Sequence, residues 1–156
     1  MTSTPFMAVE EAPESVYLHP GQIYTAAHAA YVTTILGSCI AVCLWDPVAR
    51  VGGVNHFLLP KGQGPRYGDE AMRLLVEEMT GRGAFTARMI AKVFGGASVM
   101  APVAGAPAAI GTRNIEIARL YLAATSIPIR AEQTGGRRGR KLLFHTGSGA
   151  AYVKEI

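Results

Sequence analysis

The segment TTILGSCIAVCLWDPVARVGGVNHFLLP, residues 33–60, carries most of the information on fold and function in this chain. Three apolar, β-branched runs at 31–36, 40–45 and 51–59 are separated by the turn signals Gly-Ser and Asp-Pro. Runs of this length between turn residues predict strands. Because the connections are short, we expect the three strands to be antiparallel neighbours.

Apolar periodicity outside this segment predicts two helices, at 69–81 and 113–125, the first with Asp69 as its N-cap. Further strands are expected at 16–18, 22–25, 88–94, 129–133, 140–145 and 151–154. This order predicts an α+β fold, a layered sandwich of mostly antiparallel strands with flanking helices. We expect a flexible tail at 1–15 and a single domain at 16–156.

Composition and charge pattern argue against several classes of protein. Hydrophobic residues make up 49% of the chain and charged residues 17%, which is typical of a compact globular protein. The uncharged stretch 93–112 is rich in glycine and proline, so we expect a strand end and a loop there and no membrane insertion. The absence of a recognisable secretory signal favours a cytoplasmic protein.

A short basic cluster contributes much of the net charge of +4. It consists of Arg137, Arg138, Arg140 and Lys141. The cluster lies among glycines and has no interleaved aromatic residue, unlike a typical nucleic-acid interface. We therefore expect a solvated hairpin loop and no nucleic-acid partner.

Cys39 follows the Gly-Ser turn and His56 lies in the third run, so a hairpin would be able to bring a thiol beside an imidazole. Such a pair can act as nucleophile and general base. The backbone amides of Ser38 and Cys39, behind a glycine, are candidates for an oxyanion hole. Since cysteine is among the residue types most often buried, two structural core residues are the alternative reading. The spacing permits proximity without forcing it.

The second cysteine, Cys43, has only apolar neighbours and is expected in the core. It would share one strand face with Cys39 at about 13 Å, which exceeds disulfide reach. The sequence has no zinc-type Cys/His cluster, no GxSxG and no phosphate-binding glycine loop. We therefore expect neither a metal nor a cofactor.

The sequence resembles the chemoreceptor glutamine deamidases, the CheD family of bacterial chemotaxis. The resemblance extends over nearly the whole chain from about residue 16 onward. It is carried by Thr33 and the ordered motifs LGSC, AVCLWDP, GGVNHFLLP, PRYGDEAM, KVFGGAS, IGTRN, IPIRAEQTGGRRGRK and YVKEI.

This resemblance implies a cysteine hydrolase that converts glutamine side chains of methyl-accepting chemotaxis receptors to glutamate and releases ammonia. It designates Cys39 as nucleophile, His56 as general base and Thr33 as the residue whose hydroxyl orients the imidazole. It also implies receptor methylester hydrolysis, a CheC-type phosphatase as candidate partner, and a fold similar to the catalytic domain of cytotoxic necrotizing factor toxins. The alternatives are a non-catalytic binding module for receptors or such a phosphatase, and an unrelated thiol hydrolase or transglutaminase-like enzyme.

Overall fold

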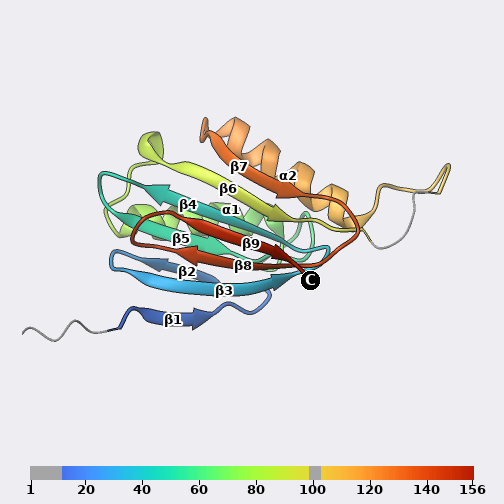
Figure 1. Cartoon of the computed structure of the whole chain (residues 1–156). Coiled ribbons are helices and arrows are strands. Elements are labelled where there is room, and N and C mark those ends of the chain that lie inside the picture. The colour runs from blue at the N-terminus through green and yellow to red at the C-terminus, as the bar shows by residue number, and fades with distance from the viewer. Residues whose placement is uncertain (1–11, 99–102) are drawn as a thin grey trace, which may run out of the picture.

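The computed structural model describes residues 12–98 and 103–156, in which strands form two sheets accompanied by two α-helices (Figure 1). The elements in chain order are β1 (Glu14–Tyr17), β2 (Ile23–Ala26), β3 (Ala30–Leu36), β4 (Ile40–Asp46), β5 (Val51–Asn55), α1 (Gly68–Gly81), a 3₁₀ turn (Thr86–Arg88), β6 (Ile90–Gly95), α2 (Ile110–Ala124), β7 (Ile129–Thr134), β8 (Arg140–His145) and β9 (Ala151–Glu155). The predicted order of strands and helices is confirmed.

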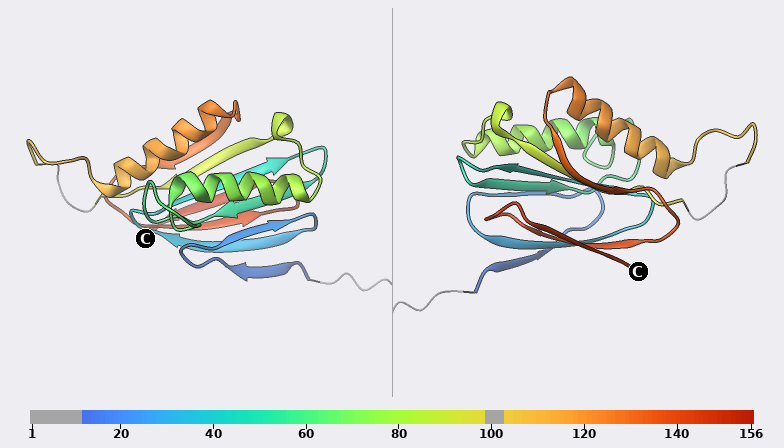
Figure 2. Two further views of the ribbon diagram at one scale, coloured as in Figure 1. Left: turned by 180° about the vertical axis from the view of Figure 1, so that it is seen from behind. Right: turned by 45° about the horizontal axis from the view of Figure 1, so that its top comes forward.

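The strands divide into a four-stranded sheet of order β1-β3-β8-β9 and a five-stranded sheet of order β2-β5-β4-β6-β7. Two neighbouring pairs, β1–β3 and β6–β7, are parallel, and the other pairs are antiparallel. Both helices pack on one face of the five-stranded sheet, and the four-stranded sheet covers its other face (Figure 2). The expected layered α+β arrangement of mostly antiparallel strands is therefore confirmed.

One part of the strand prediction is wrong, because β3 and β4 are consecutive but belong to different sheets. Burial explains the separation. Every residue of β4 is buried, as expected of a central strand covered on both faces, whereas β3 alternates between more and less buried positions. The intervening segment 37–39 therefore carries the chain from one layer to the next.

The side chains of β4 alternate between two hydrophobic cores. Ile40, Val42 and Leu44 belong to the core under the helices, while Ala41 and Cys43 belong to the core between the sheets. The expectation that Cys43 is a core residue is confirmed, since its side chain is fully buried. Both cysteines are free thiols.

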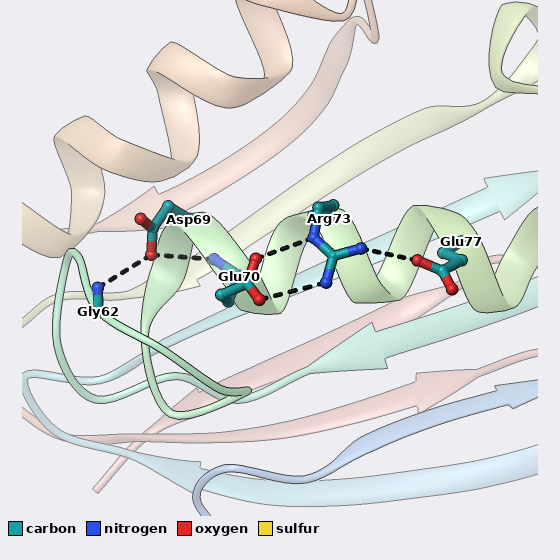
Figure 3. Close-up of polar contacts among 5 residues, drawn as sticks. All are labelled: Gly62, Asp69, Glu70, Arg73 and Glu77. Atoms are coloured by element: carbon teal, nitrogen blue, oxygen red, sulfur yellow. Dashed lines mark hydrogen bonds and ion pairs between the residues drawn. The ribbon is translucent and has the colours of Figure 1, made fainter.

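Helix α1 packs a methionine-rich face inward and carries an ion-pair ladder outside, where Arg73 contacts Glu70 and Glu77 (Figure 3). Such solvent-exposed pairs contribute little to stability. Asp69 is not the N-cap, because the helix begins at Gly68. Its carboxylate accepts hydrogen bonds from the amides of Glu70, at 2.9 Å, and Gly62, at 3.2 Å.

The N-terminal segment and one residue of the basic cluster depart from expectation. Residues 1–11 of the predicted tail lie outside the described residues, but its last two belong to β1, which begins at Glu14 and pairs with β3. Arg140 is not part of a solvated loop: it is 6% exposed and its guanidinium donates to the carbonyls of Gly95 and Gly135. No helix within 12–98 and 103–156 combines the length and apolar content needed to cross a membrane.

Candidate active site

Cys39 lies immediately before β4, at the point where the chain enters the five-stranded sheet, and its side chain is half-buried. Its carbonyl accepts a hydrogen bond from the Gly96 amide at 2.8 Å. Gly95 has a positive φ of 110°, and a Cβ there would collide with that same carbonyl. Gly95, the last residue of β6, and Gly96 thus allow the two backbones to approach closely and fix the position of the cysteine.

The register between β4 and β5 decides which side chains share a face with Cys39. Cys43 pairs with Val54, and an isolated antiparallel bridge joins Ile40 to Phe57. Ile40 lies three residues before Cys43, and Phe57 lies three residues after Val54. The two pairings therefore belong to one antiparallel register.

In that register Cys39 is opposite Leu58, and His56 lies two residues before Leu58 in the segment that follows β5. Residues two apart project to the same face of a sheet. Cys39 and His56 are therefore diagonal neighbours on the face between the sheets, a relation that places Cβ atoms about 7–8 Å apart or less. The hairpin register thus places Cys39 and His56 on one face, but no hydrogen bond joins the thiol to the imidazole in the described residues.

His56 is 1% exposed, and its Nδ1 lies 2.7 Å from the hydroxyl of Thr34 in the opposite sheet. That hydroxyl donates its single proton to the carbonyl of Leu18 at 2.7 Å. It must therefore accept from Nδ1–H of His56, which leaves Nε2 unprotonated with a free lone pair. Within the described residues Nε2 has no hydrogen-bond partner, so the Cys39 thiol does not yet contact it.

The hydroxyl contact to His56 comes from Thr34, the neighbour of the residue that the resemblance designates. Strand β3 alternates, and Thr34 is on the inward face with Val32 and Leu36 while Thr33 is on the other. Thr33 contributes its carbonyl, which accepts from the Leu18 amide at 2.8 Å. The alternation Val-x-Thr-x-Leu was visible in the sequence and would have indicated Thr34.

Burial sets the charge state of the pair. It lowers the pKa of His56 from 6.5 to about 4. Burial also raises the pKa of the Cys39 thiol, an effect that the hydrogen bond from its own amide partly offsets. At neutral pH the resting site thus contains a neutral thiol and a neutral imidazole, an arrangement suited to general-base activation rather than to a preformed ion pair.

The carbonyls before Cys39 are anchored, which fixes the direction of the amides that follow them. The Gly37 carbonyl accepts from the Ala97 amide at 2.9 Å, and the Ser38 carbonyl accepts from Asn114 Nδ2 at 3.0 Å. In a trans peptide the N–H points opposite to the C=O. The amides of Ser38 and Cys39 therefore point away from these anchors, and neither donates to a backbone carbonyl in the described part of the chain.

A cavity of about 310 Å³ opens beside this loop. It is lined by Gly37, Ser38, Ala97, Ser98, Ala109, Ile110, Gly111, Arg137 and Gly139. Gly37 faces open space, since a Cβ there would meet nothing within 4 Å. The lining includes Gly37 and Ser38 of the 37–39 loop but neither Cys39 nor His56. A larger hollow of about 510 Å³ between Arg119 and Arg140 includes no residue of that loop.

A model of the family described as "CheD chemotactic sensory transduction" matches residues 59–155. The chain belongs to the CheD family. The matched range begins after Cys39 and His56, so the assignment of those two residues rests on geometry and on the motifs around them.

Several named relatives of the CheD family cover most of the chain. "Probable chemoreceptor glutamine deamidase CheD 1" of Anaeromyxobacter dehalogenans is 50% identical over 90% of this chain and 84% of its own length. The proteins named "Probable chemoreceptor glutamine deamidase CheD" of Xanthomonas euvesicatoria and Stenotrophomonas maltophilia are 46% and 45% identical, over 89% of this chain and 72% of theirs. Among solved structures, Bacillus licheniformis hypothetical protein YfiH has a TM-score of 0.47 and 14% identity, over 69% of this chain and 48% of that one, which is too distant to bear on function.

Proposed function

We propose that this CheD-family protein deamidates glutamine side chains of chemoreceptors and that Cys39 is its nucleophile. The relatives' names support the reaction. The observation that supports the assignment to residues is the register that puts Cys39 and His56 on one sheet face, together with a His56 Nε2 that has no partner in the described residues. The chemistry needs no group beyond these side chains, the backbone amides and water.

In the first half-reaction His56 Nε2 takes the proton of the Cys39 thiol as the sulfur attacks the carboxamide carbon of glutamine. The amides of Ser38 and Cys39 bind the oxygen that becomes negative. His56 then gives its proton to the leaving nitrogen, so that the carbon–nitrogen bond breaks, ammonia departs and a thioester to Cys39 remains.

In the second half-reaction His56 takes a proton from water, which attacks the thioester carbon. The carbon–sulfur bond breaks, the sulfur regains its proton from His56, and glutamate is released. The Thr34 hydroxyl supports both halves, because it accepts from Nδ1–H and keeps Nε2 directed as the base. Thr33, the designated orienting residue, would act through its position beside Thr34.

The substrate proposed is a cytoplasmic helix of a methyl-accepting chemotaxis receptor, presented to the cavity beside Gly37. On this reading the enzyme works in the cytoplasm as one domain, 16–156. Receptor methylester hydrolysis, a CheC-type phosphatase partner and a likeness to the catalytic domain of cytotoxic necrotizing factor toxins are part of the same proposal and derive from the family resemblance. A non-catalytic binding module is the second candidate, favoured by the high pKa of the resting Cys39 thiol.

The two candidates differ in one observable reaction. Purified protein is incubated with receptor cytoplasmic fragments, and peptide mass spectrometry follows the conversion of glutamine to glutamate. Wild type and Cys43→Ser convert the same glutamines, whereas Cys39→Ala converts none. Cys43 is the matched control, because it lies on the same strand face but is sealed in the core. Conversion that survives in Cys39→Ala, or that never occurs with wild type, refutes the proposal.

A further inference from the structure

Asn114 is a fully buried polar residue near the beginning of α2. Its Nδ2 donates one hydrogen bond to the carbonyl of Ser38 at 3.0 Å and a second to the carbonyl of Leu58 at 2.9 Å. A side-chain amide nitrogen has two protons, so its donor capacity is used completely on these carbonyls. One side chain from a helix thus joins the segment of the thiol to the segment of the imidazole.

These two carbonyls flank the place where the β4–β5 ladder stops. The last backbone hydrogen bonds between the strands join Ile40 and Phe57, at 2.9 and 3.1 Å. Within the described residues no backbone hydrogen bond connects 37–39 to 58–60. Asn114 takes the place of the missing rung and continues the register to the position where Cys39 faces Leu58.

The remaining atom of the amide indicates what Asn114 is there for. Its Oδ1 is buried and has no partner in the described part of the chain. A buried polar atom without a partner destabilises the fold, and an apolar side chain at this position of the helix would avoid that penalty. The benefit of asparagine must therefore come from its two donors.

Close packing fixes the position of Asn114 relative to the loop. Gly111, one turn earlier in α2, lies so near the strand end that a Cβ there would be 2.5 Å from the Gly96 carbonyl. The neighbouring Gly96 amide in turn holds the Cys39 carbonyl. Gly96 therefore links the beginning of α2 to the loop of the nucleophile through direct contacts on both sides.

We infer that Asn114 is a positioning residue of the deamidation reaction, which aligns the Cys39 thiol with His56 by holding the Ser38 and Leu58 carbonyls together. The inference rests on the proposed function. By fixing the Ser38 carbonyl, Asn114 also directs the Cys39 amide toward the developing oxyanion. It touches neither the substrate nor the reacting atoms, and acts through the backbone.

The first test compares Asn114→Leu with Leu122→Ala, a buried apolar position of the same helix that contacts neither carbonyl. Both variants lower Tm. Asn114→Leu lowers kcat for receptor glutamine conversion by about 100-fold, the typical cost of a misplaced reacting group, with little change in KM. Leu122→Ala leaves kcat unchanged below its Tm. Equal kcat for Asn114→Leu and wild type, or equal losses in both variants, overturns the inference.

Asn114→Asp provides a pH readout that a purely structural role would not move. An ionised carboxylate has no donor for the two carbonyls, while a protonated one has a single donor. The variant is therefore as slow as Asn114→Leu at high pH and regains part of its activity as the pH is lowered. Activity that is equally low at every pH contradicts the inference.

A measurement without a receptor separates this inference from the proposed function. Iodoacetamide alkylation of Cys39 is measured in wild type, Asn114→Leu, His56→Ala and the double variant. If Asn114 aligns the pair, the two changes are coupled, and Asn114→Leu has little further effect once His56 is removed. Independent effects of the two changes overturn the inference even if wild type deamidates receptors. Coupled effects without any glutamine conversion refute the proposed function alone.

Discussion

The two ends of β4 differ in how their buried polar groups are paired. At the Asp46 end a buried carboxylate is fully hydrogen-bonded, whereas near Cys39 several buried polar atoms have no hydrogen-bond partner in the described residues. Asp46 accepts hydrogen bonds from the amides of Val48, Ala49 and Phe85 and forms an ion pair with Arg88 at 2.9 Å. Burial by itself would raise the pKa of Asp46, but these contacts outweigh it and lower the pKa to about 2.

The Cys39 end of the strand has the opposite character. The buried side-chain atoms without a partner in the described residues are Nε2 of His56, Oδ1 of Asn114 and Nε of Arg140. All three residues belong to this end of β4. His56 shares a sheet face with Cys39, and Asn114 donates to the carbonyl of Ser38. Arg140 donates to the carbonyl of Gly95, which pairs with Ile40.

On the proposed function, the comparison separates groups that stabilise the fold from groups that take part in the reaction. Satisfied buried polar groups contribute to stability, whereas unsatisfied ones reduce it and persist where function requires them. Substitutions at the Asp46 end should therefore change stability and leave chemistry intact. Substitutions at the Cys39 end should lower kcat, whether or not they also change stability.

The largest effect is expected for His56→Gln. Loss of the general base lowers kcat for glutamine conversion by roughly 100- to 10,000-fold. Circular dichroism should show a folded protein, because glutamine retains polar character without adding a charge. An activity within tenfold of wild type would mean that another group removes the thiol proton.

At the opposite end, Asp46→Ala should lower the free energy of unfolding by about 3 kcal/mol, because it leaves Arg88 and three amides without their acceptor. Urea denaturation measures this change. Below the denaturation midpoint, kcat should equal that of wild type. A large loss of kcat in the folded variant would show that the two ends are not separable.

The two ends should also respond to different ranges of pH. His56 has a pKa of about 4 in the folded protein and 6.5 when exposed, so between these values the unfolded chain binds more protons. Stability is full above 6.5 and falls by about 3 kcal/mol as the pH approaches 4. Urea denaturation across this range tests the step, which should be absent in His56→Gln. The Asp46 carboxyl does not interfere, because it titrates lower, between 3.8 and about 2.

A smaller effect is expected for Thr34→Val, which removes the acceptor of His56 Nδ1–H while keeping the shape of the side chain. The change should lower kcat about tenfold, the equivalent of roughly 1.4 kcal/mol. Thr33→Val measures the competing assignment in the same assay. A loss in Thr33→Val that exceeds the loss in Thr34→Val would return the orienting role to Thr33.

Local patterns predicted the elements well. The apolar stripe of α1, the fully apolar run of β4 and the glycine and proline turns each depend on neighbours in sequence, so the bounds were correct within a few residues. The assignment of β3 and β4 to one sheet was wrong, because local pattern does not determine which sheet a strand joins. A short Gly-Ser connection is compatible with a turn within a sheet and with a step between sheets, and long-range packing decides between them.

The candidate site could be predicted only in part. Cys39 and His56 follow from motif and spacing, and their shared face follows from a register that the sequence allowed but did not fix. Thr34 could have been found from strand alternation. Asn114 could not, because its partners Ser38 and Leu58 are far away in sequence and the contact depends on how α2 lies on the sheet.

The covalent intermediate offers the most direct test of Cys39 as nucleophile. Wild-type protein is mixed with a receptor fragment, quenched in acid and analysed by intact and peptide mass spectrometry. We expect a thioester between the substrate carbonyl and Cys39, absent in Cys39→Ala and never found on Cys43. Glutamine conversion at full rate with no adduct on Cys39, or with an adduct on another residue, would contradict the mechanism.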